Sequence, residues 1–264
     1  MRLGIIGCGN MAKAILGGAL KANVVAKENV MVSAAHQESI EKTAEQFGVQ
    51  TTLDNAKVAE YADVVILAVK PIYYEAVIAE IAEKVTMEKI FVSIAPGKTM
   101  EWLQERVGEG KKIVRTMPNT PALVGEGMTA VCYNEQMGES DKQCVMNILS
   151  SFGKAEEISE YMMDAVVAVS GSSPAYVYMF IEAMADAAVA EGLPRAAAYQ
   201  FAAQAVYGSA KMVLETGLHP GVLKDQVCSP GGTTIQAVEV LEKNGMRSAV
   251  MEAMTACAEK SRNM

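Results

Sequence analysis

The sequence predicts an α/β Rossmann-like dinucleotide-binding domain over residues 1–158, followed by an all-helical domain over residues 159–264. Three observations predict this fold. A short apolar strand at the start of the chain runs into the turn Gly7-x-Gly9-x-x-Ala12, and a helical pattern follows at once. Apolar strands and helices then alternate, which is typical of a mainly parallel sheet with helices on both faces. Beyond this alternation the strand signals stop and helical patterns continue.

The composition indicates a globular protein with reduced cysteines. The formal net charge is −8, which argues against a nucleic-acid-binding protein because such proteins carry a basic face. There are two histidines and five cysteines without metal-ligand spacing, so we expect no metal site and a cytoplasmic location. The cysteines are Cys8, Cys132, Cys144, Cys228 and Cys257.

The segment between Asp164 and Glu182 is uncharged, but it does not predict a membrane span. Ser170–Pro174 interrupts its middle, so the apolar run falls short of the length that crosses a bilayer. We expect a buried helix or a pair of helices here, and no association with a membrane.

The first turn of the chain predicts a dinucleotide site. Gly7 permits the tight turn, Gly9 lets the backbone approach a pyrophosphate, and Ala12 lets helix and strand pack closely. The helix that follows offers free N–H groups and the positive end of its dipole to the phosphates. The alternative is an ordinary strand-to-helix turn, since glycine-rich turns are common.

The second expected strand, residues 30–33, bears on which dinucleotide binds. An Asp or Glu usually meets the ribose 2′-hydroxyl of NAD at this point, and this chain has Ser33, two alanines and His36 instead. Without the acid a 2′-phosphate is not repelled, and Ser33 can donate a hydrogen bond to it. We therefore expect NADPH, with NADH as the second candidate because no arginine is present. We expect His36 to be a solvent-exposed loop residue.

Apolar periodicity and turn residues predict the other elements of this half. The expected helices are 37–47, 55–61, 72–84, 100–107 and 140–152, and the expected strands are 64–69, 90–94, 113–115, 128–133 and 155–158. The run 64–69 is continuously apolar, which predicts burial on both faces of a parallel sheet. It ends in Lys70-Pro71, at the edge where such sheets bind ligands, although Pro71 also suits the start of a helix. Two prolines make residues 116–121 a rigid, non-helical segment at the same edge.

The second half of the chain predicts helices at 194–215, 235–243 and 247–260. Their polar faces are narrow for so small a domain, so we expect a second copy of the chain to cover their apolar surface.

Two segments of small residues interrupt these helices. Residues 170–176 allow close approach by a ligand or, equally, tight packing of helices. Residues 229–234, Ser-Pro-Gly-Gly-Thr-Thr, lead into a helix and predict a site where backbone N–H groups hold a carboxylate or phosphate. The alternative is a helix cap supplied by a threonine. A cap needs one such residue and this segment has several, which favours anion binding.

These features predict a reductase or dehydrogenase for a small organic acid. We find no histidine–aspartate pair, metal-ligand set or cysteine–histidine nucleophile in the sequence pattern. A ketone needs a proton donor when hydride arrives, whereas a protonated imine already carries its charge. The lack of acid–base residues in the sequence pattern therefore favours an imine substrate, which the site needs only to position.

Four motifs, in order along the whole chain, resemble those of pyrroline-5-carboxylate reductases: Val69–Pro71, Arg115–Pro121, Ser170–Tyr176 and Ser229–Thr234. The resemblance implies NAD(P)H-dependent reduction of 1-pyrroline-5-carboxylate to L-proline, the last step of proline biosynthesis, in the cytoplasm. It also implies a helical domain that interlocks with its partner in a homodimer, in some members within a decamer. The alternatives are a reductase of another cyclic imine acid or a β-hydroxyacid, and a non-catalytic NAD(P)-binding protein.

The resemblance also implies site residues. For the cofactor they are Gly7, Cys8, Gly9, Asn10, Met11, Ala12, Ser33, Asn55, Ala68, Val69, Lys70, Pro71, Ala95, Pro96 and Gly97. For the substrate they are Ser229, Gly232, Thr233 and Thr234, with Glu160 and Gln226 nearby, and Thr234 is the catalytic residue whose hydroxyl bonds the ring nitrogen. The chain departs from the family pattern at Ser173 and Pro96, which affect local backbone fit. The missing arginine after Ser33 leaves the cofactor preference open.

Overall fold

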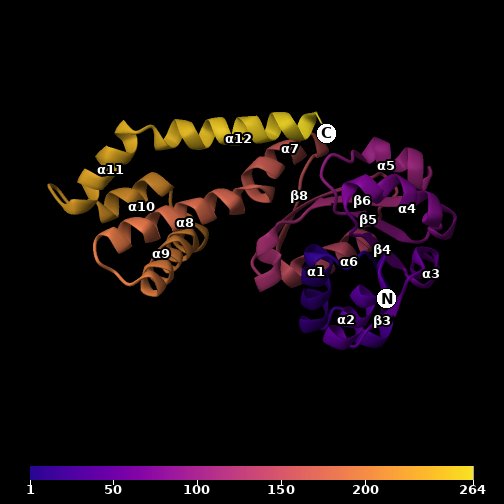
Figure 1. Ribbon diagram of the computed structural model, residues 1–264. Coiled ribbons are helices and arrows are strands. Elements are labelled where there is room, and N and C mark those ends of the chain that lie inside the picture. Colours follow the sequence, from indigo (N-terminus) through magenta and orange to yellow (C-terminus); the bar gives the residue numbers. More distant parts are fainter. Residues whose placement is uncertain (264) are drawn as a thin grey trace. The chain divides into compact units, whose positions relative to one another are not determined.

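The computed structural model describes residues 1–263, which form two compact units (Figure 1). The first unit comprises residues 1–172 and the described residues from Cys257 onward, and the second comprises Ser173–Ala256. The chain therefore leaves the first unit after Ser172 and returns to it in its last helix. The domain boundary expected between residues 158 and 159, where strand signals stop, stays a prediction.

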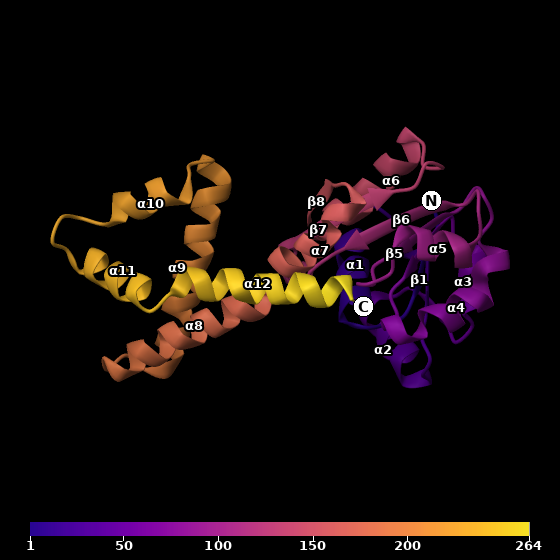
Figure 2. The same cartoon turned by 90° about the horizontal axis from the view of Figure 1, so that it is seen from above.

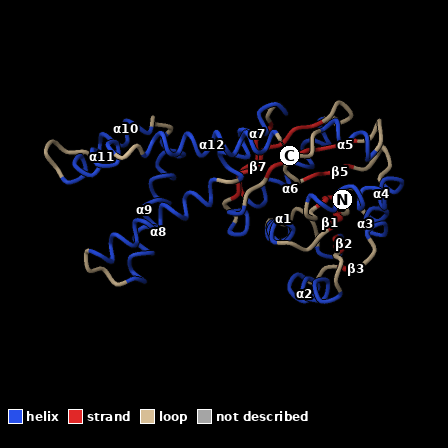
Figure 3. Tube along the Cα trace, turned by 45° about the horizontal axis from the view of Figure 1, so that its top comes forward, coloured by secondary structure: helices blue, strands red, loops and turns tan. Residues whose placement is uncertain are grey.

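Within residues 1–263, the strands form one sheet in the first unit (Figure 3). They are β1 (Leu3–Ile6), β2 (Val30–Ser33), β3 (Gln50–Thr52), β4 (Val64–Leu67), β5 (Ile90–Ser93), β6 (Lys112–Met117), β7 (Gly127–Tyr133) and β8 (Gly153–Glu157). Their order is β3-β2-β1-β4-β5-β6-β7-β8, with β6 and β7 antiparallel and the other described neighbours parallel. The strand order reverses between β1 and β4, which creates a switch point where open α/β sheets bind ligands.

Helices cover both faces of this sheet. They are α1 (Asn10–Lys21), α2 (Gln37–Phe47), α3 (Asn55–Tyr61), α4 (Tyr74–Ile81), α5 (Met100–Val107) and α6 (Glu139–Leu149). Ile5 of β1 packs in a buried cluster that includes Leu16 of α1, whereas Ile6 packs in a second cluster that includes Ile78 of α4. Successive strand residues point to opposite faces, so an unbroken apolar strand supplies both layers.

Most of the expected elements of this half are confirmed. The strand 30–33 and the helices 37–47, 55–61 and 100–107 have the predicted bounds. Short 3₁₀ turns flank the longer elements: Lys27–Asn29, Pro71–Tyr73, Ala82–Lys84, Thr120–Val124, Ser150–Phe152 and Glu160–Met162.

Several expectations for this half are wrong in detail. The helices expected at 72–84 and 140–152 are the shorter α4 and α6, each continued by a 3₁₀ turn, and β3 was not expected. The segment 116–121 is not wholly irregular, because β6 extends to Met117 and Pro121 lies in the first turn of a 3₁₀ helix, where its missing N–H costs nothing.

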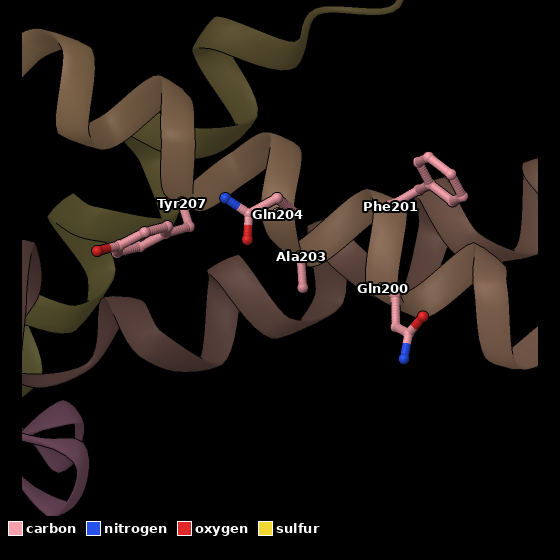
Figure 4. A pocket seen from close by; sticks show the side chains of 5 residues that line it. All are labelled: Gln200, Phe201, Ala203, Gln204 and Tyr207. Carbon is pink, nitrogen blue, oxygen red and sulfur yellow. The ribbon is translucent and has the colours of Figure 1, made fainter.

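The second unit is helical, as expected, and exposes much apolar surface in the single chain. It contains α8 (Ser173–Ala190), α9 (Arg195–Thr216), α10 (Pro220–Val227), α11 (Thr233–Lys243) and most of α12 (Met246–Arg262), with α8 packed on α9 (Figure 2). Met179 of α8 is 69% exposed and Phe201 of α9 is 71% exposed. Figure 4 shows Phe201 and Tyr207 projecting from α9, and both line a pocket on this helix.

The uncharged segment 165–181 forms helices but is not buried as expected. It spans α7 (Met163–Val166), the π-helical turn Val167–Gly171 and the first half of α8, whose side chains are largely exposed in the single chain. No helix among the described residues is both long and apolar enough to cross a membrane.

Candidate active site

The turn after β1 requires glycine at its first position. Gly7 has φ +113°, and a Cβ there would lie 2.5 Å from the carbonyl oxygen of Ala68. Gly9 differs, since its φ is −71° and a Cβ built on it would meet no heavy atom within 4 Å beyond its chain neighbours. Gly9 is the N-cap of α1 and supplies no side-chain cap, so the first N–H groups of that helix are left for another partner. This open cradle fits a dinucleotide's diphosphate.

A cavity of about 620 Å³ opens at this turn. Of the predicted cofactor residues, Gly7, Cys8, Gly9, Asn55, Ala68, Val69 and Lys70 line it. Its other lining residues, which the sequence analysis did not assign to the site, are Ala34, Ala35, His36, Ser39, Leu53, Tyr73, Ala76, Val77 and Glu80. The cavity follows the carboxyl ends of β1, β2 and β4 at the switch point, where the fold class predicts the dinucleotide. His36 is exposed, as expected, but also lines the cavity.

The remaining predicted cofactor residues lie around the cavity without lining it. Asn10, Met11 and Ala12 form the first turn of α1, and Ala12 is buried against the sheet. Pro71 begins the 3₁₀ turn before α4. Residues 95–97, Ala-Pro-Gly, follow β5, whose register with β4 pairs Leu67 with Ser93 and so brings them to the same sheet edge.

The structure gives Ser33 a partner within the chain, and its contact with a cofactor stays a prediction. Its side chain is fully buried, and its hydroxyl donates to Oδ1 of Asn55 at 2.8 Å. The hydroxyl is therefore already engaged, and Ser33 does not line the cavity where a 2′-phosphate would lie. Nδ2 of Asn55 in turn donates to Oε2 of Glu80 at 2.7 Å. Ser33 supports Asn55, which does line the cavity, and Glu80 was missed because it lies on a helix far along the chain.

A buried tyrosine fixes the ends of β4 and β5 below the cavity. The Tyr74 hydroxyl donates to the carbonyl of Leu67 at 2.6 Å and accepts from the backbone N–H of Ile94 at 3.2 Å. Burial raises the pKa of Tyr74 to about 12. The hydroxyl bridges two strand ends that would otherwise leave polar groups unpaired, so it stabilises the edge that carries Ala68–Lys70 and Ala95–Gly97.

The segment around Asn119 connects the sheet edge to the first part of the helical half. Asn119 Nδ2 donates to the carbonyl of Ser170 at 3.1 Å, and its Oδ1 accepts from the N–H of Met128 at 2.8 Å. A Cβ on Gly171 would lie 2.7 Å from the side chain of Met117. At Gly171, small size therefore serves tight packing, which was one of the two readings of residues 170–176.

The loop before α11 is bare of side-chain caps. Gly231 has φ +68°, and Gly232 is the N-cap of α11 without a side-chain cap bond. A Cβ on Gly232 would lie 2.3 Å from Oγ of Ser229, so a larger residue there would require the Ser229 side chain to move. The alternative of a threonine cap is wrong, because Thr233 and Thr234 lie inside the helix. The free N–H groups at this helix start suit a carboxylate.

The other two predicted substrate residues lie apart in the chain. Glu160, in the first unit, accepts from Nη1 of Arg115 and from the backbone N–H of Met100, both at 2.6 Å. Arg115 is 5% exposed, so this carboxylate compensates a buried charge. Gln226 is exposed at the end of α10 in the second unit, as Ser229 is in the loop that follows.

Each of the five cysteines is free, and no group of metal-binding side chains is present within residues 1–263. Cys8 lines the cavity, with its thiol donating to the carbonyl of Ser33 at 3.6 Å.

Comparison with known families supports both halves of this description. Residues 160–264 match the family described as pyrroline-5-carboxylate reductase dimerisation. Residues 2–97 match the family described as NADP oxidoreductase, coenzyme F420-dependent. The second match covers the strand–turn–helix units that line the cavity.

Whole proteins with the same two parts are also similar. The chain is 53% identical to pyrroline-5-carboxylate reductase of Escherichia coli (strain K12) over 263 residues, covering 100% of this chain and 98% of that protein. Among solved structures, pyrroline carboxylate reductase from Plasmodium falciparum with NADP bound matches with a TM-score of 0.91 and 36% identity, covering 100% of this chain and 97% of that one. A pyrroline-5-carboxylate reductase from Coxiella burnetii matches with a TM-score of 0.92 and 35% identity, covering 99% and 97%.

Proposed function

We infer that this chain, which belongs to the pyrroline-5-carboxylate reductase family, reduces 1-pyrroline-5-carboxylate to L-proline with NADPH, the final step of proline biosynthesis. The observation that carries the inference is similarity to named reductases along the full length of the chain, through both the dinucleotide turn and the glycine-capped α11.

The first unit holds the cofactor. The N–H groups at the start of α1 bind the diphosphate, because Gly9 leaves them open and no acidic residue lies in the first turn of that helix. Asn55, fixed through Ser33, meets the adenosine part, and Val69 and Lys70 lie toward the nicotinamide part. When bound, reduced nicotinamide supplies hydride to the imine carbon. NADH remains the second candidate cofactor.

The start of α11 holds the substrate. Backbone N–H groups of Thr233 and Thr234 receive the carboxylate beside Gly232, whose own N–H donates to the carbonyl of Ser229 at 3.0 Å and so fixes the loop. The Thr234 hydroxyl makes no hydrogen bond within the described chain, so it is available to the ring nitrogen. The protonated imine already carries its positive charge, so orienting it is the main task of the site. Contacts of Glu160 and Gln226 with the substrate stay predictions from the family resemblance.

The helical unit forms the homo-oligomer. The matched dimerisation family covers α8–α12, and these helices expose apolar side chains such as Met179 and Phe201 in the single chain. We propose that two copies bury this surface in a dimer, that dimers assemble further into a decamer, and that the enzyme works in the cytoplasm.

The direct test is oxidation of NADPH and of NADH by the purified protein with 1-pyrroline-5-carboxylate. We expect proline formation in proportion to NADPH consumed. Binding of NADPH without turnover would indicate the non-catalytic alternative, and faster turnover of another cyclic imine acid or of a β-keto acid would change the substrate.

The role of Thr234 has its own test. Thr234→Ala should lower kcat by about a hundredfold, the usual loss for a positioned hydrogen-bond group, and leave the Kd of NADPH unchanged. Thr255→Ala, an exposed threonine on α12, is the matched control and should keep full activity. Full turnover by Thr234→Ala would remove this hydroxyl from the mechanism.

A further inference from the structure

A carboxylate lies in the cofactor cavity at a place where the second strand offers none. In dinucleotide-binding sheets an acid after this strand accepts from the ribose 2′-hydroxyl, and here β2 ends in the buried Ser33. Ser33 donates to Asn55 at 2.8 Å and Asn55 donates to Glu80 at 2.7 Å. This hydrogen-bonded row connects the end of β2 to an acid on α4. Glu80 itself lines the cavity.

The row fixes the orientation of Asn55 and Glu80. A carboxylate only accepts hydrogen bonds, so the amide nitrogen of Asn55 must face Glu80 and its oxygen must face Ser33. One N–H of Asn55 and the outer lone pairs of Glu80 stay available to a bound ribose.

The charges that line the cavity make Glu80 distinctive. Among the described lining residues it is the one carboxylate, and the groups that can carry positive charge are Lys70 and His36. The other titratable lining groups are the Cys8 thiol and the Tyr73 hydroxyl. A 2′-phosphate adds nearly two negative charges, whereas a 2′-hydroxyl adds a hydrogen-bond donor. Glu80 thus interacts oppositely with the two cofactors.

We propose that Glu80 is a specificity-determining residue, which accepts a hydrogen bond from the ribose 2′-hydroxyl of NADH and repels the 2′-phosphate of NADPH. Glu80 thereby replaces the acidic residue that usually follows the second strand of an NAD-binding sheet and that is missing after β2. Glu80 is exposed at the cavity rim, so solvent screens its charge and the repulsion limits the preference for NADPH without abolishing NADPH binding. This inference rests on the proposed function only in its choice of cofactors.

The test is equilibrium binding of NADPH and NADH to the full-length protein without substrate, followed by nicotinamide fluorescence. Glu80→Gln keeps an acceptor for Asn55 and removes the charge. We expect its ratio of NADPH affinity to NADH affinity to rise about five- to tenfold over the wild type, the size of a screened contact between charges at a surface. Adenosine 2′,5′-bisphosphate and 5′-AMP, which lack nicotinamide, should show the same shift in competition.

Two further variants distinguish the effect of the Glu80 charge from the effect of its hydrogen bond to Asn55. Glu80→Ala also removes the partner of Asn55, so it should weaken binding of both cofactors in addition to shifting their ratio. Glu45→Gln removes one exposed carboxylate of α2 outside the cavity lining and should leave the ratio unchanged. A ratio for Glu80→Gln within twofold of the wild type, in a protein that binds both cofactors, would overturn the proposal. Wild-type binding of neither dinucleotide would instead refute the proposed function.

Discussion

The two glycines of the first turn should fail in different ways when each is replaced by alanine. Gly7 holds a positive φ of +113°, and its added Cβ would lie 2.5 Å from a backbone oxygen of Ala68. A non-glycine residue in such a region costs about 1–3 kcal/mol, and the contact is with backbone that cannot rotate away. Ala68 is itself held by its N–H bond to Ile6 at 2.8 Å. We therefore expect Gly7→Ala to lose about 3 kcal/mol of stability.

Gly9→Ala should affect binding instead of folding. Its φ of −71° suits any residue, and the space around its Cβ is open. The loss of a glycine N-cap costs less than about 1 kcal/mol. The new methyl group, however, occupies the approach of the diphosphate, so we expect the Kd of NADPH to rise at least about tenfold, which corresponds to about 1.4 kcal/mol.

Calorimetry tests the expected losses of stability in the two variants, and NADPH titration tests the expected loss of binding. At about 2–4 °C per kcal/mol, the first unfolding transition should fall by about 6–12 °C for Gly7→Ala and by at most about 4 °C for Gly9→Ala. A Gly9→Ala protein that unfolds normally and binds NADPH as tightly as the wild type would refute the assignment of this turn to the diphosphate. A Gly7→Ala protein of unchanged stability would refute the steric argument.

Three other predictions concern stability and assembly. Glu160→Gln removes the negative charge that compensates the buried Arg115 and should destabilise the protein by about 1–3 kcal/mol. Urea unfolding measures this loss against Glu156→Gln, an exposed carboxylate of β8, as control. Tyr74, with its pKa raised to about 12 by burial, stays protonated in the folded state while the unfolded chain ionises near pH 10, so stability should fall between pH 10 and 12. Tyr74→Phe should be less stable at pH 7 yet show a smaller fall over that window, and an equal fall would contradict this account. Light scattering at micromolar concentration should give at least twice the 28.1 kDa chain mass, and a stable monomer would contradict the proposed dimer.

The sequence by itself determined the local structure closely wherever short-range physics decides it. The bounds of α2 follow from its periodicity and from Gly48, which takes the left-handed conformation that ends the helix. The start of α3 follows from Asp54, whose side chain caps Lys57 as its residue type predicts. Gly7 was recognisable because the tight turn between the first strand and the first helix demands glycine.

Only the tertiary structure decided which side chains share the cavity and which already form hydrogen bonds to other side chains. Ser33 was the natural candidate for a 2′-phosphate by its place after β2, but burial and Asn55 engage its hydroxyl. Glu80 and Glu160 form bonds to Asn55 and Arg115 across 25 and 45 residues of sequence. Periodicity and turn chemistry act over a few residues, whereas such pairings depend on how the sheet orders its strands. That ordering, not the residue types alone, places an acid in the cofactor cavity.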